Sequence, residues 1–151
     1  GAETYQGLEQ VQFYICPNPG QPLAPLDLIA SGGEMSRICL ALELIGLEVS
    51  EPTTIIFDEV DAGIGGAIAE IVGTSLKKLS DRHQVLCITH LPQVAYQGHQ
   101  HLRIMKAQGK ASTKTSVELL SKETRVEELS RMLGGVNITD ATRAHAKELL
   151  G

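Results

Sequence analysis

The sequence predicts an α/β protein built around parallel strands. Residues 53–57 and 84–89 are short apolar runs, and a helical pattern at about residues 64–79 connects them. A strand, a helix and a second strand in this order form a right-handed parallel unit. The chain has 151 residues, 42% hydrophobic and 21% charged, which is enough to bury roughly two-thirds of its unfolded surface. We therefore expect a single domain over residues 1–151, with a parallel strand core and flanking helices.

Two elements are expected before this unit. Apolar residues alternate over residues 8–16, as in a half-buried strand. Prolines within residues 17–27 exclude a helix or a central strand there. A helix begins at Ser31, whose hydroxyl forms the S-x-x-E capping box with Glu34. Apolar residues on both faces predict that this helix is buried on most sides.

The C-terminal part predicts two strands followed by two helices. The strands cover about residues 101–106 and 114–120, and two amphipathic helices cover residues 123–133 and 139–150. The sequence contains no internal repeat, no low-complexity segment and no sign of a second domain.

Composition argues against several classes of function. No apolar run approaches the ~20 residues that span a bilayer, and the first residues lack the features of a secretion signal, so we expect a cytosolic protein without a membrane partner. The formal net charge of −5 argues against a general nucleic-acid clamp. With five aromatic residues and no Trp, there is little material for base stacking. Any nucleic acid would be bound through local charge.

The three cysteines predict no disulfide framework. Cys16, Cys39 and Cys87 are odd in number, distant in sequence and mostly within apolar runs. This pattern is typical of reduced core residues in a cytosolic protein.

Ionisable side chains follow both predicted parallel strands. Asp58 and Glu59 follow the first strand, and His90 follows the second. Ligands bind beyond the carboxyl ends of the strands in an open parallel sheet. An apolar strand followed by Asp-Glu is the Walker B arrangement, in which Asp holds Mg²⁺ and Glu polarises the water that attacks the γ-phosphate of ATP. Acidic residues at strand ends are also common turn formers, so this pair alone leaves both interpretations open.

Two glycine-rich segments accompany these residues. Ser31-Gly32-Gly33-Glu34 begins a helix, where free N–H groups favour an anion and glycines let a phosphate approach the backbone, although an ordinary helix cap has the same residues. Residues 61–66, Asp-Ala-Gly-Ile-Gly-Gly, are also compatible with a flexible turn. The four segments in this order, ending with Ile-Thr-His at residues 88–90, are not expected by chance.

With these motifs, the sequence resembles the ATP-binding-cassette (ABC) ATPases. Their signature motif is similar to residues 29–37, and their Walker B motif is similar to residues 54–59. Their D-loop is similar to residues 61–66, and their switch histidine is similar to Thr89-His90. Within this class, nearly the whole chain is most similar to the RecN family, bacterial DNA-repair proteins related to the structural-maintenance-of-chromosomes (SMC) family. Met35 stands where Leu is usual in the signature, a volume-conserving change.

One motif of the family is absent. The sequence contains no G-x-x-x-x-G-K-[ST] phosphate loop, or Walker A. In RecN-like proteins this loop lies near the N-terminus, before a long coiled coil, and the chain then returns to complete the head. The resemblance therefore implies the C-terminal lobe of an ABC-type P-loop NTPase head. Its expected partners are the Walker A lobe, a second head and DNA, in the bacterial cytosol at the nucleoid.

The resemblance also implies roles for single residues. Two heads would sandwich two ATP molecules and hydrolyse them to ADP and phosphate. Asp58 would serve Mg²⁺, Glu59 the attacking water, and His90 the γ-phosphate. Asp61 would link the two sites. The signature residues that would contact the nucleotide of the opposing head are Ser31, Gly32, Gly33 and Glu34.

Two other functions stay open. The chain could be a non-catalytic assembly module, or a metal-dependent nuclease whose ligands are Asp58, Glu59, Asp61 and His90. The nuclease interpretation leaves the Ser-Gly-Gly-Glu helix start without a role.

Two weaker patterns lie further along the chain. His99 and His101 lack a third ligand with suitable spacing, which favours a solvated strand end over a metal site. A stretch free of acidic residues could contact DNA or form an exposed hairpin, and its basic residues are Arg103, Lys106, Lys110 and Lys114.

Overall fold

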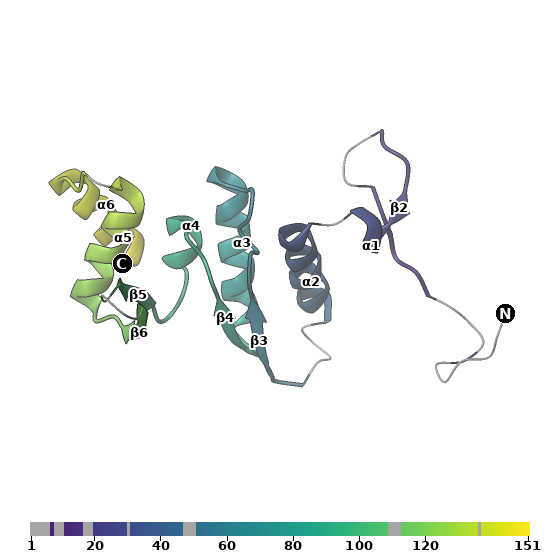
Figure 1. Cartoon of the computed structure of the whole chain (residues 1–151), viewed down its shortest axis with the longest axis horizontal. Helices are drawn as coiled ribbons and strands as arrows, with labels where there is room; N and C mark the ends of the chain where they lie inside the picture. Colours follow the sequence, from purple (N-terminus) through teal and green to yellow (C-terminus); the bar gives the residue numbers. More distant parts are fainter. Residues whose placement is uncertain are drawn as a thin grey trace.

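The predicted parallel unit lies at the centre of the fold. The computed structural model describes residues 7, 11–16, 20–29, 31–46, 51–108, 113–135 and 137–151, and its elements follow one another in a row along the molecule (Figure 1). Strand β3 (Thr54–Phe57) pairs in parallel with β4 (Gln84–Cys87), and Phe57 lies beside Cys87 in the register. Helix α3 (Gly66–Leu79) connects the two strands. The mixed α/β prediction is therefore confirmed.

Helix α2 (Gly32–Gly46) packs on α3 and completes the main core. The buried side chains of this core are Leu40, Phe57, Val60, Val72, Leu76, Leu79 and Val94. Only one face of α2 is covered, since Leu40 is buried whereas Ile45 is 81% exposed. The prediction that this helix is buried on most sides is wrong, because its apolar residues encircle the helix while α3 contacts only one side of it.

The N-terminal elements are short and bury few apolar side chains. Strand β1 (Tyr14–Ile15) pairs antiparallel with β2 (Ala24–Pro25), and the one-turn helix α1 (Leu26–Ile29) follows. The half-buried strand predicted over residues 8–16 is therefore formed only at Tyr14–Ile15, where Ile15 is half-buried; Val11 and Phe13 are exposed, and residues 8–10 lie outside the described residues. The end of the predicted loop forms β2, where Pro25 is tolerated because the strand lies at an edge. The exclusion of a helix up to residue 27 is wrong, because α1 begins at Leu26, directly after the last proline of this stretch.

The C-terminal elements match the predicted order. After a short helix that was not predicted, α4 (Pro92–Ala95), strand β5 (Leu102–Gln108) pairs antiparallel with β6 (Thr113–Leu119). Helices α5 (Lys122–Gly134) and α6 (Asp140–Leu150) then pack on each other. None of the helices in the described ranges is long and apolar enough to cross a membrane.

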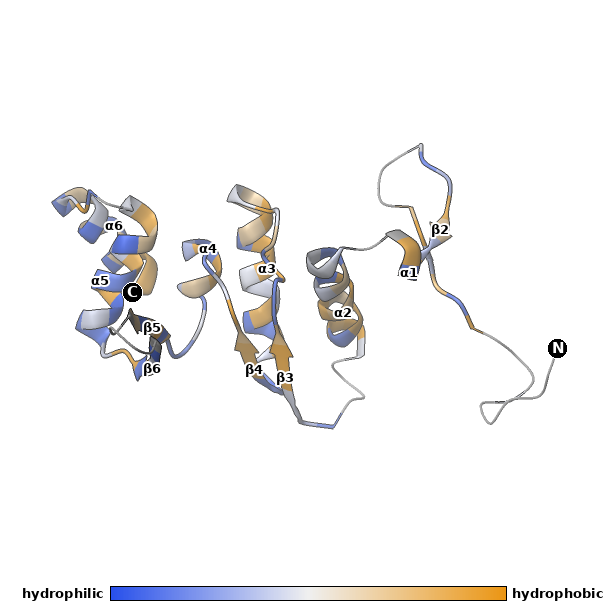
Figure 2. Ribbon diagram, viewed as in Figure 1, coloured by the Kyte–Doolittle hydropathy of each residue, from blue (hydrophilic) through white to orange (hydrophobic). Residues whose placement is uncertain are grey.

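Much apolar surface remains uncovered. The accessible surface is 10867 Å², against about 7,500 Å² for a compact monomer of this mass. Strands β3 and β4 are apolar along most of their length (Figure 2), yet Ile56, Leu86 and Ile88 are exposed. Contiguous exposed apolar surface of this kind is typical of faces that bind other protein surfaces.

Candidate functional site

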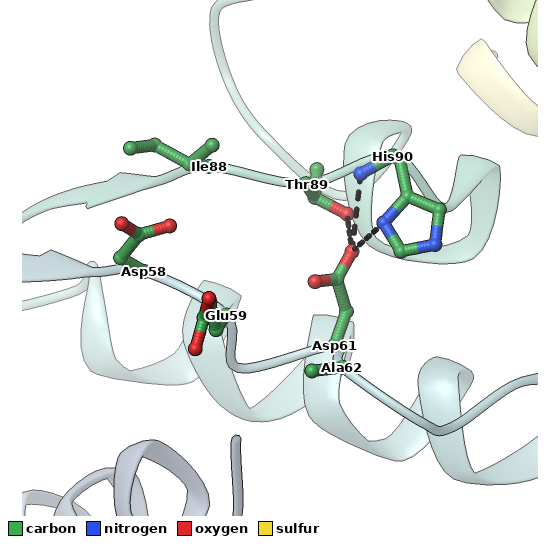
Figure 3. Close-up of a pocket in the computed structure, with 7 residues that line it drawn as sticks. All are labelled: Asp58, Glu59, Asp61, Ala62, Ile88, Thr89 and His90. Atoms are coloured by element: carbon green, nitrogen blue, oxygen red, sulfur yellow. Dashed lines mark hydrogen bonds and ion pairs between the residues drawn. The ribbon is translucent and has the colours of Figure 1, made fainter. Parts of the chain in front are cut away.

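An open pocket lies beyond the carboxyl ends of β3 and β4. Its volume is about 270 Å³, and its lining consists of Asp58, Glu59, Asp61, Ala62, Ile88, Thr89 and His90 (Figure 3). The structure thus brings the acidic pair and the histidine that follow the two strands to one edge of the sheet.

Asp61 joins the two strand ends. Its side chain is buried, and one carboxylate oxygen, Oδ2, accepts hydrogen bonds from the Thr89 hydroxyl and from the His90 backbone N–H at 3.1 Å. The same oxygen lies 3.3 Å from Nδ1 of His90, whose ring is 76% exposed (Figure 3). The carboxylate therefore fixes one edge of the imidazole and leaves Nε2 available to a ligand.

The carboxylates of Asp58 and Glu59 are exposed at the mouth of the pocket. Neither takes part in an ion pair among the described residues. The described part of the chain also contains no group of three or more His, Cys, Asp or Glu side chains placed to hold a metal ion. A cation here would therefore need further ligands from a bound molecule, from water or from another protein surface.

Glu59 has an unusual backbone conformation. Its φ of +58° lies in the left-handed region, which costs a residue with a side chain about 1–2 kcal/mol. A turn hydrogen bond from Ala62 N–H to the Glu59 carbonyl, at 2.9 Å, accompanies this conformation. We call residues 58–62 the acidic turn.

Helix α2 holds this turn by two side chains that the sequence analysis missed. The Ser36 hydroxyl donates to the Asp58 carbonyl at 2.7 Å. Arg37 donates through Nη1 to the carbonyls of Val60 and Ala62, at 3.2 and 3.0 Å. Their acceptors are backbone atoms, which leave no trace in the sequence.

The predicted capping box at the start of α2 is confirmed. Ser31 N–H donates to the Glu34 carboxylate at 2.8 Å, and Glu34 N–H donates to the Ser31 hydroxyl at 3.3 Å. The hydrogen bond from the Ser31 backbone N–H to the carboxylate is the main cause that lowers the pKa of Glu34 below its ordinary value. Both signature side chains are therefore engaged within their own helix.

The two glycines of the Ser-Gly-Gly-Glu segment lie beside the acidic turn of the same chain. Gly33 is buried, and a Cβ there would lie 2.9 Å from both the Glu59 carbonyl oxygen and the Ala62 Cβ. Gly32 is exposed, and its added Cβ would meet only the carboxylate of Glu59, at 2.6 Å. Close approach of α2 to the turn thus requires glycine at residue 33.

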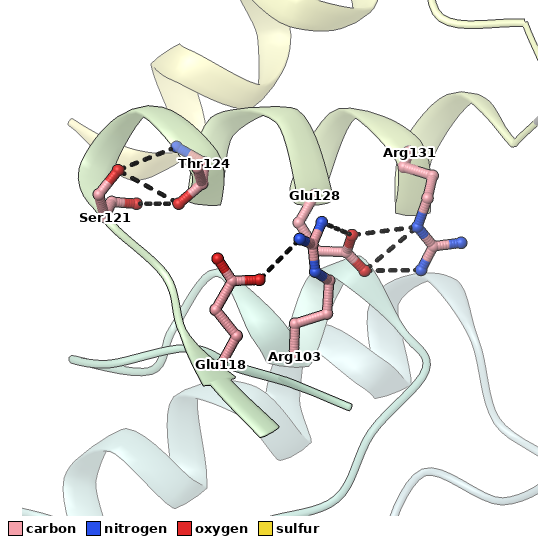
Figure 4. Close-up of polar contacts among 6 residues, drawn as sticks. All are labelled: Arg103, Glu118, Ser121, Thr124, Glu128 and Arg131. Atoms are coloured by element: carbon pink, nitrogen blue, oxygen red, sulfur yellow. Dashed lines mark hydrogen bonds and ion pairs between the residues drawn. The ribbon is translucent and has the colours of Figure 1, made fainter. Parts of the chain in front are cut away.

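The predicted basic stretch is partly neutralised. Arg103 forms an ion pair with Glu118 at 2.8 Å across the β5–β6 hairpin and lies 3.6 Å from Glu128 of α5 (Figure 4). Hydrogen bonds from Arg131 to Glu128 lower the pKa of that carboxyl. Arg103 thus helps to join the hairpin to α5, and Lys110 lies outside the described residues.

Two of the three cysteines are not core residues. Cys16 and Cys39 are exposed, because Cys39 lies on a face of α2 that α3 does not cover and the segment containing Cys16 has no covering layer. Cys87 is half-buried, and burial together with the neighbouring Asp61 and Asp58 carboxylates raises the pKa of its thiol to about 12. Among the described residues, none of the three cysteines is in a disulfide.

We predict that Gly33→Ala lowers the free energy of unfolding of the chain by about 1–3 kcal/mol, since the new methyl group would press on the Glu59 carbonyl. Gly46→Ala is the matched control in the same helix, because an added Cβ there has no neighbour within 4 Å. Urea unfolding of both variants measures the difference. Equal stability of the two variants would show that α2 does not pack closely on the turn.

We also predict that iodoacetamide at pH 8 labels Cys16 and Cys39 quickly and Cys87 slowly. With a pKa of about 12, only about one Cys87 thiol in 10⁴ is deprotonated at pH 8, and this fraction rises only as the pH approaches 12. Peptide mass spectrometry measures the three rates. In urea the difference should disappear, and fast labelling of Cys87 in the folded chain would contradict its burial beside the two carboxylates.

The sequence is similar to known DNA-repair proteins. No family model matches the sequence. The DNA repair protein RecN of Xylella fastidiosa (strain Temecula1) is 51% identical over 144 residues, that of Vibrio cholerae 49% over 144 residues, and that of Bacillus subtilis 48% over 147 residues. These alignments cover 95%, 95% and 97% of this chain and 26% of each relative.

A solved structure from a study of the structural biochemistry of SMC ATPases also aligns with the chain. The alignment covers 80% of this chain and 79% of that chain, with a TM-score of 0.49 and 19% sequence identity. The curated relatives are far more similar in sequence. Over 95% of its length, the chain is homologous to one segment of the RecN DNA-repair proteins, and it spans about a quarter of their length.

Proposed function

We propose that the chain is the C-terminal lobe of an ATP-hydrolysing head in a RecN-like DNA-repair protein. The observation that carries this proposal is the meeting of Asp58, Glu59 and His90 at the carboxyl ends of two parallel strands, beside the start of α2. Similarity of about 50% identity to RecN proteins supports the assignment to DNA repair. The chain would act in the bacterial cytosol and at the nucleoid, with DNA bound mainly by the complete protein.

The acidic pair fits a divalent cation and a water molecule. Asp58 and Glu59 present exposed carboxylates that no cationic side chain of the described residues neutralises. Oxygen ligands of this kind suit Mg²⁺, which usually keeps several waters and binds through one or two carboxylates together with substrate phosphates. When bound, Mg²⁺ would neutralise part of the phosphate charge. Asp58 would serve the cation, and Glu59 would orient the attacking water and accept its proton.

His90 would contact the γ-phosphate through Nε2. The Asp61 carboxylate, 3.3 Å from Nδ1, favours a proton on that nitrogen. Nε2 is then the ring nitrogen that remains for the γ-phosphate. Asp61 would thereby connect the D-loop to the γ-phosphate.

The start of α2 would act on the nucleotide of a second head. The first N–H groups of a helix have no partner within it, and in the described part of the chain the N–H groups of Gly32 and Gly33 have no acceptor. Ser31 and Glu34 hold this helix start in shape through the capping box. Such a helix end favours an anion, here the γ-phosphate presented by the opposing head.

The observations bear differently on the two alternatives, a metal-dependent nuclease and a non-catalytic assembly module. A metal-dependent nuclease would need a cluster of ligands, whereas the described residues contain no such group and Asp61 is engaged with Thr89 and His90. The exposed apolar strand faces favour an assembly role, which the proposed head includes, because they would bind the Walker A lobe.

We predict that the chain alone neither binds ATP tightly nor hydrolyses it, because it lacks the phosphate loop and its lysine. Phosphate release measured on the purified chain, and again after mixing with a Walker A lobe, tests this prediction. Turnover should appear only in the mixture. Saturable turnover by the chain alone that Glu59→Gln abolishes would refute the assignment as one lobe.

We predict that Glu59→Gln in the complete head preserves Mg·ATP binding and slows turnover by about 10²-fold or more, since an amide cannot accept the proton. Head dimers should accumulate with ATP. Glu148→Gln, at an exposed position of α6, is the matched control and should turn over normally. Normal turnover in Glu59→Gln would show that Glu59 is only a turn residue.

A further inference from the structure

Helix α2 fixes the backbone on both sides of Glu59. The carbonyl before it, of Asp58, accepts from Ser36, and the carbonyl after it, of Val60, accepts from Arg37. The Glu59 carbonyl itself accepts from Ala62 N–H. Three consecutive carbonyls thus have donors, and two of these donors are side chains of α2.

These contacts support a conformation that Glu59 does not favour by itself. A residue with a side chain stays in the left-handed region only where its surroundings over-determine it. If the flanking carbonyls were released, the φ of +58° would relax and the carboxylate would point elsewhere. The direction of the Glu59 side chain therefore depends on α2.

Arg37 suits this task better than another cation would. Its Nη1 serves the carbonyls of both Val60 and Ala62, and the planar guanidinium stays charged and keeps a fixed geometry. Gly33, Ser36 and Arg37 share one face of α2, at helical spacings of three and four. The close approach at Gly33 brings the other two side chains within reach of the turn.

We infer that Arg37, together with Ser36, is a positioning residue that holds Glu59 in its catalytic direction. This inference rests on the proposed function. It has a mechanical consequence, because the helix that would contact the nucleotide of the opposing head also sets the general base of its own head. A displacement of the start of α2 changes both sites together.

Hydrogen exchange in the chain, measured without ATP, tests whether Arg37 holds the turn. Arg37→Ala should speed exchange of the Ala62 amide by about tenfold or more while the amides of α3 keep their protection. Arg125→Ala is the matched control, since Arg125 donates to the carbonyls of Ala95, Tyr96 and Gly98 and does not contact the turn. If Arg37→Ala unfolds the chain, Arg37→Lys is judged by the same criterion. Unchanged exchange at Ala62 in a folded variant overturns the inference.

Kinetics of the complete head test the catalytic part. Arg37→Ala should lower kcat by about 10- to 100-fold with an unchanged Kd for Mg·ATP, because a misplaced base slows chemistry and not binding. In a Glu59→Gln background the same substitution should have little further effect. An equal loss in both backgrounds overturns the positioning role. Normal turnover in Glu59→Gln alone overturns the proposed function instead, and Ala62 exchange then still decides whether Arg37 holds the turn.

Discussion

The buried carboxylate of Asp61 is the contact on which the pocket depends. A carboxylate that is only 3% exposed is stable only when hydrogen bonds replace its water. The Thr89 hydroxyl and the His90 backbone N–H, in the segment after β4, supply two such bonds, and Nδ1 of the His90 ring lies 3.3 Å from the same oxygen. The pairing of β3 with β4 aligns the strand ends, and the Asp61 side chain adds a direct link between the segments that follow them.

Helix α2 holds the other side of the same turn. Gly33 permits contact, and Ser36 and Arg37 convert that contact into directed hydrogen bonds. The turn is therefore fixed through its backbone by α2 and through the Asp61 side chain by the segment after β4. Glu59 lies between these two sets of contacts. Its left-handed backbone conformation is the energetic cost of forming both sets.

Local features could be predicted from the sequence, whereas burial could not. The Ser31–Glu34 spacing predicts the capping box because neighbouring residues decide it. The connecting helix predicts parallel pairing of the two apolar runs because a strand–helix–strand crossover brings the two strands side by side in the same direction. The expected burial of α2 and of Cys39 was wrong, since an apolar residue indicates only that a face can be covered. Arg37 escaped notice because its acceptors are backbone carbonyls, and any sequence supplies those.

The charge of the pocket gives a physical reason why the proposed lobe would need another surface. Asp58, Glu59 and Asp61 bring three carboxylates to the pocket, and its lining contains no Lys or Arg. A nucleotide triphosphate would meet like charge there, and within a few ångströms such repulsion costs several kcal/mol near a protein surface. A cation and a lysine-bearing phosphate loop would reverse this balance. The same arrangement that suits the proposed chemistry would therefore disfavour nucleotide binding by the chain alone, so the proposed function would require assembly with a positively charged partner surface.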